Sequence, residues 1–174
     1  MGYYYYLAAQ LPYLVLGNEI PMSSAAFKTL ARDTMSSSDA IMLDYCTLDP
    51  VPEAPASSDF IRRWNEWEMA LRVNLARGRA LKLKREDGVE PMDFPVEAVL
   101  AAKNALVMES PLEAELFLDG ARWDAIESFQ GTNVFSESAM YAYLLKLLLM
   151  ERRAAFNAEE GFTEYKALYA AILG

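Results

Sequence analysis

One stretch, residues 57–86, constrains the fold more than any other part of this 174-residue chain. It reads SSDFIRRWNEWEMALRVNLARGRALKLKRE, and no proline interrupts it. At about 100° per residue, one narrow helical face collects large apolar side chains. These are Phe60, Trp64, Trp67, Leu71 and Leu75, with Gly78 at the far end. We therefore predict one long helix over about 57–86, whose two-tryptophan stripe other helices must cover.

The second half of this stretch is slender and basic. Its small residues, which would let another backbone approach closely, are Ala70, Ala76, Gly78 and Ala80. Its six cations, with no acid between them, are Arg72, Arg77, Arg79, Lys82, Lys84 and Arg85. They favour the helix dipole and solubility, or they form a binding surface for an acidic partner. We keep them as partner-binding candidates and expect Arg77 and Lys84 to point outward together, at helical spacing.

Three shorter helices are predicted before the long one, over residues 3–10, 25–34 and 39–47. For residues 3–10 the aromatic run favours a strand and the following Leu-Ala-Ala-Gln favours a helix; we expect the helix, with the strand as the alternative. Pro12 ends the first, because proline disfavours helical backbone at the preceding residue. Serines at 23–24 and 37–38 offer N-cap oxygens to the second and third. Residues 49–58 contain three prolines and read as an exposed connector into the long helix.

Four helices are predicted after it, over residues 95–107, 111–128, 139–157 and 163–173. Asp93 is the expected cap of the first, whose expected inner face is Val96, Val99, Leu100 and Ala102. The second starts with the capping box Ser110-Pro111-Leu112-Glu113. Its expected inner face is Leu112, Leu116, Trp123 and Ile126, with a break or kink at Gly120.

The leucine-rich segment 136–157, capped by Ser136, is apolar almost all round, which is typical of the central helix of a bundle. No sustained alternation of apolar and polar residues predicts a strand. The predicted fold is therefore all-α, an irregular bundle of about seven helices. It is built around the long helix (about 57–86) and the leucine-rich helix (about 136–157). We expect a single domain over 1–174, with a subdivision near 87–94 as the alternative.

The residue inventory argues against an enzyme. There is no histidine, which removes Ser-His and Cys-His nucleophile pairs and histidine metal sites. Cys46 is alone among apolar neighbours and is expected to be a buried small hydrophobe. The carboxylate groupings, expected to lie on solvated helix faces, are Glu113/Glu115, Asp119/Asp124 and Glu159/Glu160. We predict no catalytic, cofactor-binding or metal-binding residues.

The net charge of −9 makes free nucleic acid and an anionic membrane poor partners for the whole surface. The most apolar run, Ala139–Met150, is too short to span a bilayer and contains Lys146. No secretory signal is recognised, and a single cysteine suits a reducing cytoplasm. We therefore expect no nucleic-acid partner, no direct membrane insertion and a cytoplasmic location.

Three stretches together resemble a known family. The opening YYYYLAAQLPYL is similar to the Tyr-Tyr-Tyr-Leu-x-Ala-x-Leu-Pro start of an uncharacterised bacterial family encoded in V-type (A/V-type) ATP synthase operons. FIRRWNEWEMALRVNLARGRA resembles that family's aromatic-rich helix. ARWDAIESFQGTNVFSESAMYAYLLKLLLMERRAAFNAEEG resembles its Arg-Trp…Tyr-x-x-Lys-Leu…Glu-Arg…Gly segment. The stretches occur in the same order as in the family and extend over most of the chain.

That family in turn resembles a shortened form of the C subunit of the archaeal enzyme, known in eukaryotes as the d subunit. The resemblance implies an all-helical, non-catalytic protein at the junction of the central stalk and the membrane ring of a proton- or sodium-translocating ATP synthase. Its implied partners are the stalk and ring subunits. Its implied place is peripheral to the inner membrane, through the complex. A helical adaptor unrelated to the ATPase is the alternative expectation.

Overall fold

The computed structural model describes residues 3–51, 57–85, 88 and 90–155, and in these ranges the fold is an all-α bundle, as predicted. Its elements are α1 (Tyr5–Gln10), α2 (Ser24–Thr34), α3 (Ser37–Met42), the 3₁₀ turn η1 (Leu43–Tyr45), α4 (Asp59–Lys82), α5 (Val96–Val107), α6 (Pro111–Gln130) and α7 (Glu137–Ala155). The predicted last helix, 163–173, lies outside the described residues.

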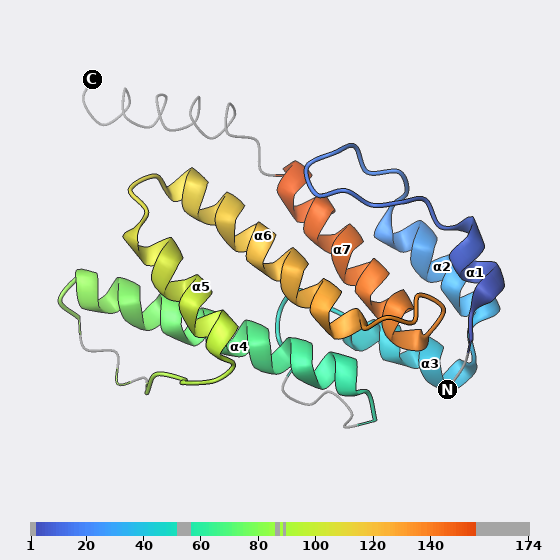
Figure 1. The fold of residues 1–174 in the computed structure, drawn as a ribbon, viewed down its shortest axis with the longest axis horizontal. Helices are drawn as coiled ribbons and strands as arrows, with labels where there is room; N and C mark the ends of the chain where they lie inside the picture. The colour runs from blue at the N-terminus through green and yellow to red at the C-terminus, as the bar shows by residue number, and fades with distance from the viewer. Residues whose placement is uncertain (1–2, 52–56, 86–87, 89, 156–174) are drawn as a thin grey trace, which may run out of the picture.

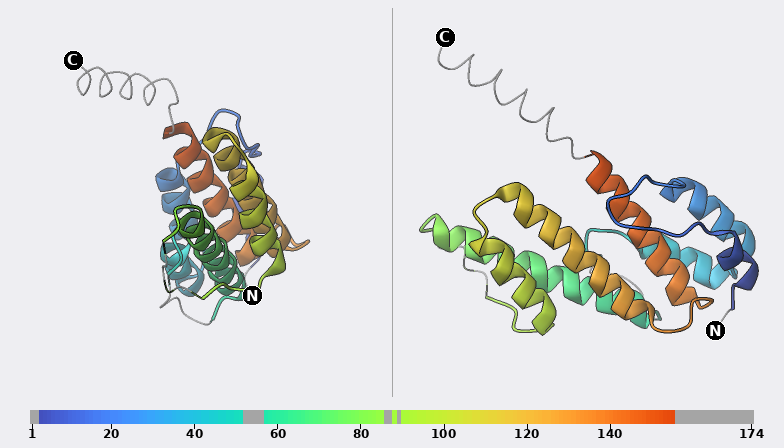
Figure 2. Two further views of the ribbon diagram at one scale, coloured as in Figure 1. Left: turned by 90° about the vertical axis from the view of Figure 1, so that its left-hand side faces the viewer. Right: turned by 45° about the horizontal axis from the view of Figure 1, so that its top comes forward.

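Helices α5, α6 and α7 lie side by side, with α2 beyond α7, and α4 crosses beneath them (Figure 1). The turned views in Figure 2 show α4 on one side of this row and α1 beside α2. The long helix thus contacts all three helices that follow it in the chain. The predicted central pair, α4 and the leucine-rich α7, does lie at the middle of the bundle.

Serine hydroxyls cap most of the helices, because an N-cap oxygen satisfies a backbone N–H that the first turn leaves unpaired. The predicted caps of α2, α6 and α7 are confirmed: Ser23, Ser110 and Ser136 accept from the backbone N–H three residues later. Two predicted caps are wrong. Ser36, rather than Ser37 or Ser38, caps α3. Asp93 does not cap α5, which begins directly after Pro95 with no side-chain cap.

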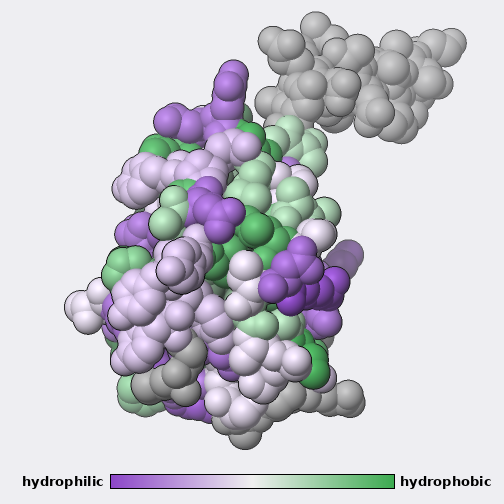
Figure 3. Space-filling model, turned by 90° about the vertical axis from the view of Figure 1, so that its right-hand side faces the viewer, coloured by the Kyte–Doolittle hydropathy of each residue, from purple (hydrophilic) through white to green (hydrophobic). Residues whose placement is uncertain are grey.

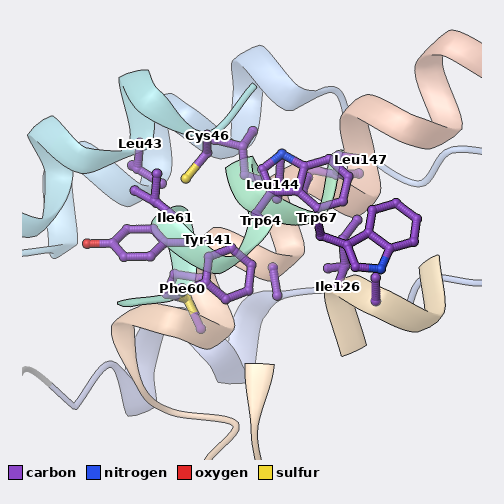
Figure 4. Packing of buried hydrophobic residues seen from close by; sticks show 14 of the residues in the cluster. Leu43, Cys46, Phe60, Ile61, Trp64, Trp67, Ile126, Tyr141, Leu144 and Leu147 are labelled. Carbon is purple, nitrogen blue, oxygen red and sulfur yellow. The ribbon is translucent and has the colours of Figure 1, made fainter. Parts of the chain in front are cut away.

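The tryptophan stripe of α4 is buried as predicted. Trp64 is 0% exposed and Trp67 is 3% exposed, and their rings stack with centroids 6.0 Å apart (Figure 4). The indole nitrogen of Trp64 donates to the carbonyl oxygen of Thr47 over 2.8 Å. Leu144 and Leu147 of α7 pack in the same cluster. These aromatic rings anchor α4 to α7 and to the segment that follows α3.

The predicted inner face of α5 is only partly confirmed. Ala102 is buried as predicted, whereas Val96 and Leu100 are about half exposed, and the other buried residues are Ala98, Ala101 and Ala105. The reason is close packing: a Cβ added at Gly78 of α4 would overlap the Cδ1 atom of Leu106 and lie 3.2 Å from its Cγ. Helices that approach so closely contact through small residues, so the larger side chains of α5 turn outward. The slender second half of α4 was correctly predicted to admit another backbone.

The predicted inner face of α6 is also partly wrong. Ile126 is buried, but Leu112 and Leu116 are 41% and 39% exposed, and Trp123 is half-buried. Leu118, Asp119 and Arg122 lie inside instead. The helix runs without a break through Gly120.

The long helix ends at Lys82, earlier than predicted. Arg85 N–H donates to the Ala80 carbonyl over 3.0 Å, and Lys84 N–H donates to the Leu81 carbonyl over 3.1 Å. This pair of bonds is a Schellman motif, which requires a left-handed residue, and Lys84 has φ 54°. Lys84 therefore takes the position at which glycine is usual.

Candidate partner-binding surfaces

The six predicted partner-binding cations do not share one face. Arg72 is half-buried: its Nε donates to Glu68 Oε1 over 2.8 Å, and its Nη2 lies 2.7 Å from Asp49 Oδ1. Partial burial opposes its charge, but the two carboxylates outweigh burial and raise the pKa of Arg72. Arg77 is half-buried as well. Arg72 and Arg77 are thus less exposed than the four cations that follow them.

The remaining four cations cluster at the end of α4. Arg79 forms an ion pair with Glu115 of α6 over 3.5 Å, and Lys82 donates to the carbonyl oxygen of Leu106. Lys84 and Arg85 are exposed beyond the helical residues. Arg77 and Lys84 do not share the outward face predicted from helical spacing, because the helix ends between them.

A buried ionic network crosses the middle of the molecule. Glu68 of α4 is 0% exposed, and its carboxylate accepts from Arg122 Nε over 2.9 Å and from Arg122 Nη2 over 3.0 Å. Asp119 lies 3.7 Å from Arg122 Nη1 and also pairs with Arg152 of α7. Each buried charge therefore has an opposite partner, as burial requires. The network ties α4 to α6 and α6 to α7.

The sequence alone did not predict this network, and it placed Asp119 on a solvated helix face. One signal was present for Glu68. It follows Trp64 by four residues and so lies at the edge of the tryptophan stripe. No comparable signal marked Arg122, which is 54 residues away from Glu68 in the chain.

Cys46 is buried, as predicted, and is 1% exposed. Burial raises the pKa of its thiol far above the ordinary value, which removes the reactive thiolate at neutral pH. Burial likewise raises the pKa of Tyr143 to about 12.

In the part of the chain that the structure describes, no group of His, Cys, Asp and Glu side chains could hold a metal ion. None of the described helices is long and apolar enough to cross a membrane.

A groove of about 830 Å³ lies between α4, α5 and α6. Trp67 and three alanines, Ala101, Ala121 and Ala125, line its base, together with Gly120. Leu100, Phe117 and Phe129 add apolar walls. The charged residues at its edge are Arg63, Glu66, Glu97 and Asp124, all exposed. We name this feature the α4–α5–α6 groove.

A second surface is rich in tyrosine. Tyr3, Tyr5, Tyr6 and Tyr13 are exposed, from 55% to 89%, while Tyr4 and Leu7 turn inward. The Tyr5 ring lies 4.5 Å from that of Phe135, between centroids. Hydrophobic residues form patches among polar ones on the side of the molecule that carries α1 to α3 (Figure 3). Tyrosine is common at protein interfaces because its ring is apolar and its hydroxyl is polar.

Comparisons of this chain with protein-family models, with curated proteins and with solved structures find no match. A functional proposal therefore depends on the geometry and on the residue resemblance. The described surfaces are a basic helix end, an apolar groove with acidic edges, and an exposed tyrosine cluster. All three are suited to binding another macromolecule.

Proposed function

We propose that this chain is a non-catalytic subunit or assembly partner of a V-type (A/V-type) proton- or sodium-translocating ATP synthase. It would be similar to the C subunit and act at the junction of the central stalk and the membrane ring. The observation that carries this proposal is the order of the three family-like stretches along the chain. They correspond to α1 and the residues after it, to most of α4, and to the second half of α6 with α7.

Several physical features support the proposal. The fold is all-helical, as the resemblance implies for a relative of the C subunit. The groove, the tyrosine cluster and the basic helix end give it more than one surface for neighbouring subunits. In this proposal the chain lies on the cytoplasmic side and is peripheral to the inner membrane through the complex.

A helical adaptor unrelated to the ATPase is the second candidate. The observation that favours it is the groove itself, because an apolar groove edged with charge serves any helical partner. The two candidates differ in which proteins bind the chain, and not in the chemistry of its surfaces.

The decisive experiment is affinity purification of the tagged full-length chain from detergent-solubilised membranes of the organism that encodes it. Mass spectrometry should find stalk and ring subunits of the ATPase enriched over a control tag. Deletion of the gene should reduce the amount of assembled ATPase on native gels. Recovery of other proteins without ATPase subunits, and unchanged assembly after deletion, would replace this proposal with the adaptor.

A further inference from the structure

We propose that the α4–α5–α6 groove binds an amphipathic helix of a partner protein, with the apolar face of that helix inward and basic residues along its flanks. The inference rests on the proposed function, within which the partner is another subunit of the ATPase. Three features of the groove support it: its shape, a hydrogen-bond donor that solvent reaches and the charges at its edge.

The base of the groove is shaped for a closely approaching helix. Ala121 and Ala125 follow Gly120 on α6, so the base consists of small residues flanked by the larger Leu100 and Phe117. A Cβ built at Gly120 has no atom within 4 Å, so this position opens into free space. Small residues let the backbones of two helices come close, and the larger walls bury the side chains between them. The volume of about 830 Å³ lies in the range of binding clefts, about 300–1,000 Å³.

Trp67 offers a hydrogen-bond donor to a partner. It lines the groove and is 3% exposed, but its indole nitrogen is not among the buried unpaired atoms of the described residues, which are Arg122 Nη1 and Glu137 Oε2. Trp64 and Trp123, by contrast, donate to Thr47 and Glu127. The indole nitrogen of Trp67 lies on the side of its ring away from Trp64 and toward α6 (Figure 4). A polar group of the partner helix would replace water at this nitrogen.

The charges at the edge select a basic partner. Glu66 is already paired with Arg62 over 2.9 Å, and the guanidinium of Arg63 lies over the ring of Phe129, 4.6 Å from its centroid. Glu97 and Asp124 are therefore the carboxylates that the edge offers to a partner. Lysines or arginines along a docked helix would therefore meet carboxylates on both α5 and α6. Such complementarity speeds association and orients the partner. The α5 side chains beside the groove add apolar surface for the partner, because Leu100 and Val96 are about half exposed.

The first test measures binding of a fluorescent peptide made of two Leu-Lys-Lys-Leu-Leu-Lys-Leu heptads. A peptide with glutamate in place of each lysine is the control of opposite charge. Gly120→Leu should fill the groove without a clash, whereas Gly120→Ala should leave it open. We expect wild type and Gly120→Ala to bind the lysine peptide, and Gly120→Leu to lose about tenfold or more in affinity. Equal affinity of the two glycine variants would overturn the inference.

Charge and the tryptophan give two further readouts. Glu97→Lys with Asp124→Lys should weaken binding much more than Glu19→Lys with Asp33→Lys, which changes the net charge equally at exposed sites outside the groove. Equal weakening by both pairs would mean general attraction to an acidic protein and would contradict a groove site.

In ¹⁵N spectra, peptide addition should shift the indole resonance of Trp67 more than that of Trp64. A shift confined to other tryptophans would exclude the groove.

The second test separates this inference from the proposed function. Wild type, Gly120→Ala and Gly120→Leu are each used to purify the ATPase from solubilised membranes. Loss of a subunit with Gly120→Leu alone would support both proposals. Equal recovery by all three would overturn the groove while the ATPase function stands. If wild type recovers no ATPase subunit, the proposed function fails and the peptide assay alone decides what the groove binds.

Discussion

The two halves of α4 bury their surfaces in opposite ways. The first half packs large rings: Trp64 and Trp67 stack on each other and contact the leucine-rich cluster of α7. The second half packs closely through a residue without a side chain, because Gly78 lets the side chain of Leu106 of α5 lie against the backbone of α4. Bulky residues make the first contact wide and rich in buried apolar area, while small residues make the second one close. The first half of α4 thus belongs to the core of the bundle. The second half is slender, and we call it the arm of α4.

Glu68 marks the boundary between the halves. Its buried carboxylate pairs with Arg122 of α6 just where the aromatic stripe gives way to the arm. Ion pairs on the arm, such as Arg79–Glu115, are by contrast exposed. The comparison predicts that equivalent substitutions have large effects in the first half and small effects in the second.

The largest effect is expected for Trp64→Ala. It should reduce the free energy of unfolding by about 3–5 kcal/mol, because it removes a fully buried ring and leaves the Thr47 carbonyl without its donor. Leu81→Ala on the arm, where Leu81 is 64% exposed, should change it by less than about 0.5 kcal/mol. Urea unfolding measures both. Similar losses would abolish the distinction between core and arm.

Glu68→Gln comes next, with an expected loss of about 3 kcal/mol, because the buried Arg122 loses its nearest counter-charge and keeps only Asp119, 3.7 Å away. The matched arm variant, Glu115→Gln, removes an exposed partner of Arg79 and should lose less than about 1 kcal/mol. Denaturation at low and high salt measures the two. A loss for Glu68→Gln as small as that for Glu115→Gln would mean that the network contributes little.

The two helical glycines should respond with opposite signs. Gly78→Ala should destabilise by about 1–3 kcal/mol, because its Cβ meets Leu106 and forces α5 away. Gly120→Ala should stabilise by about 1 kcal/mol, because the added Cβ meets nothing and alanine is the better helix former. Thermal unfolding of both variants is the measurement. Stabilisation by Gly78→Ala would show that α5 adapts to the added methyl group without loss.

Lys84→Gly tests how the arm ends. Lys84 holds the left-handed position of the Schellman motif, where a side chain is unfavourable and glycine is not. The substitution should raise the free energy of unfolding by up to about 1 kcal/mol. The gain is less than the full preference for glycine at this position, because glycine also increases the conformational entropy of the unfolded chain. Chemical denaturation of the two proteins measures the difference. Destabilisation would mean that the lysine side chain makes a contact worth more than the strain.

The smallest effect on stability is expected for Lys84→Glu with Arg85→Glu, two exposed cations of the basic helix end. The free energy of unfolding should change by less than about 0.5 kcal/mol. If an acidic subunit binds here, its recovery from solubilised membranes at low salt should fall, mainly through slower association. Unchanged recovery would leave these cations to the helix dipole and to solubility.

Much of the fold was predictable from local patterns. The stripe from Phe60 to Leu75, the Ser110 capping box and the Ser136 cap depend on residues within a few positions of one another. The candidate site was less predictable. The cations of α4 were found, but their spacing assumed a helix that continued past Lys82, whereas Lys84 already leaves it. The groove was missed, because Leu100 was assigned to an inner face that packing leaves open.

The sequence by itself determined the helices, most of their caps and the tryptophan face, because periodicity and capping are properties of consecutive residues. Only the tertiary structure decided that α5 buries alanines, that Glu68 meets Arg122 across 54 residues, and that a groove remains between α4, α5 and α6. The physical reason is that both apolar faces of α5 satisfy the helical period equally well. The distance at which α4 approaches, set by Gly78 and Leu106, selects the one that is buried.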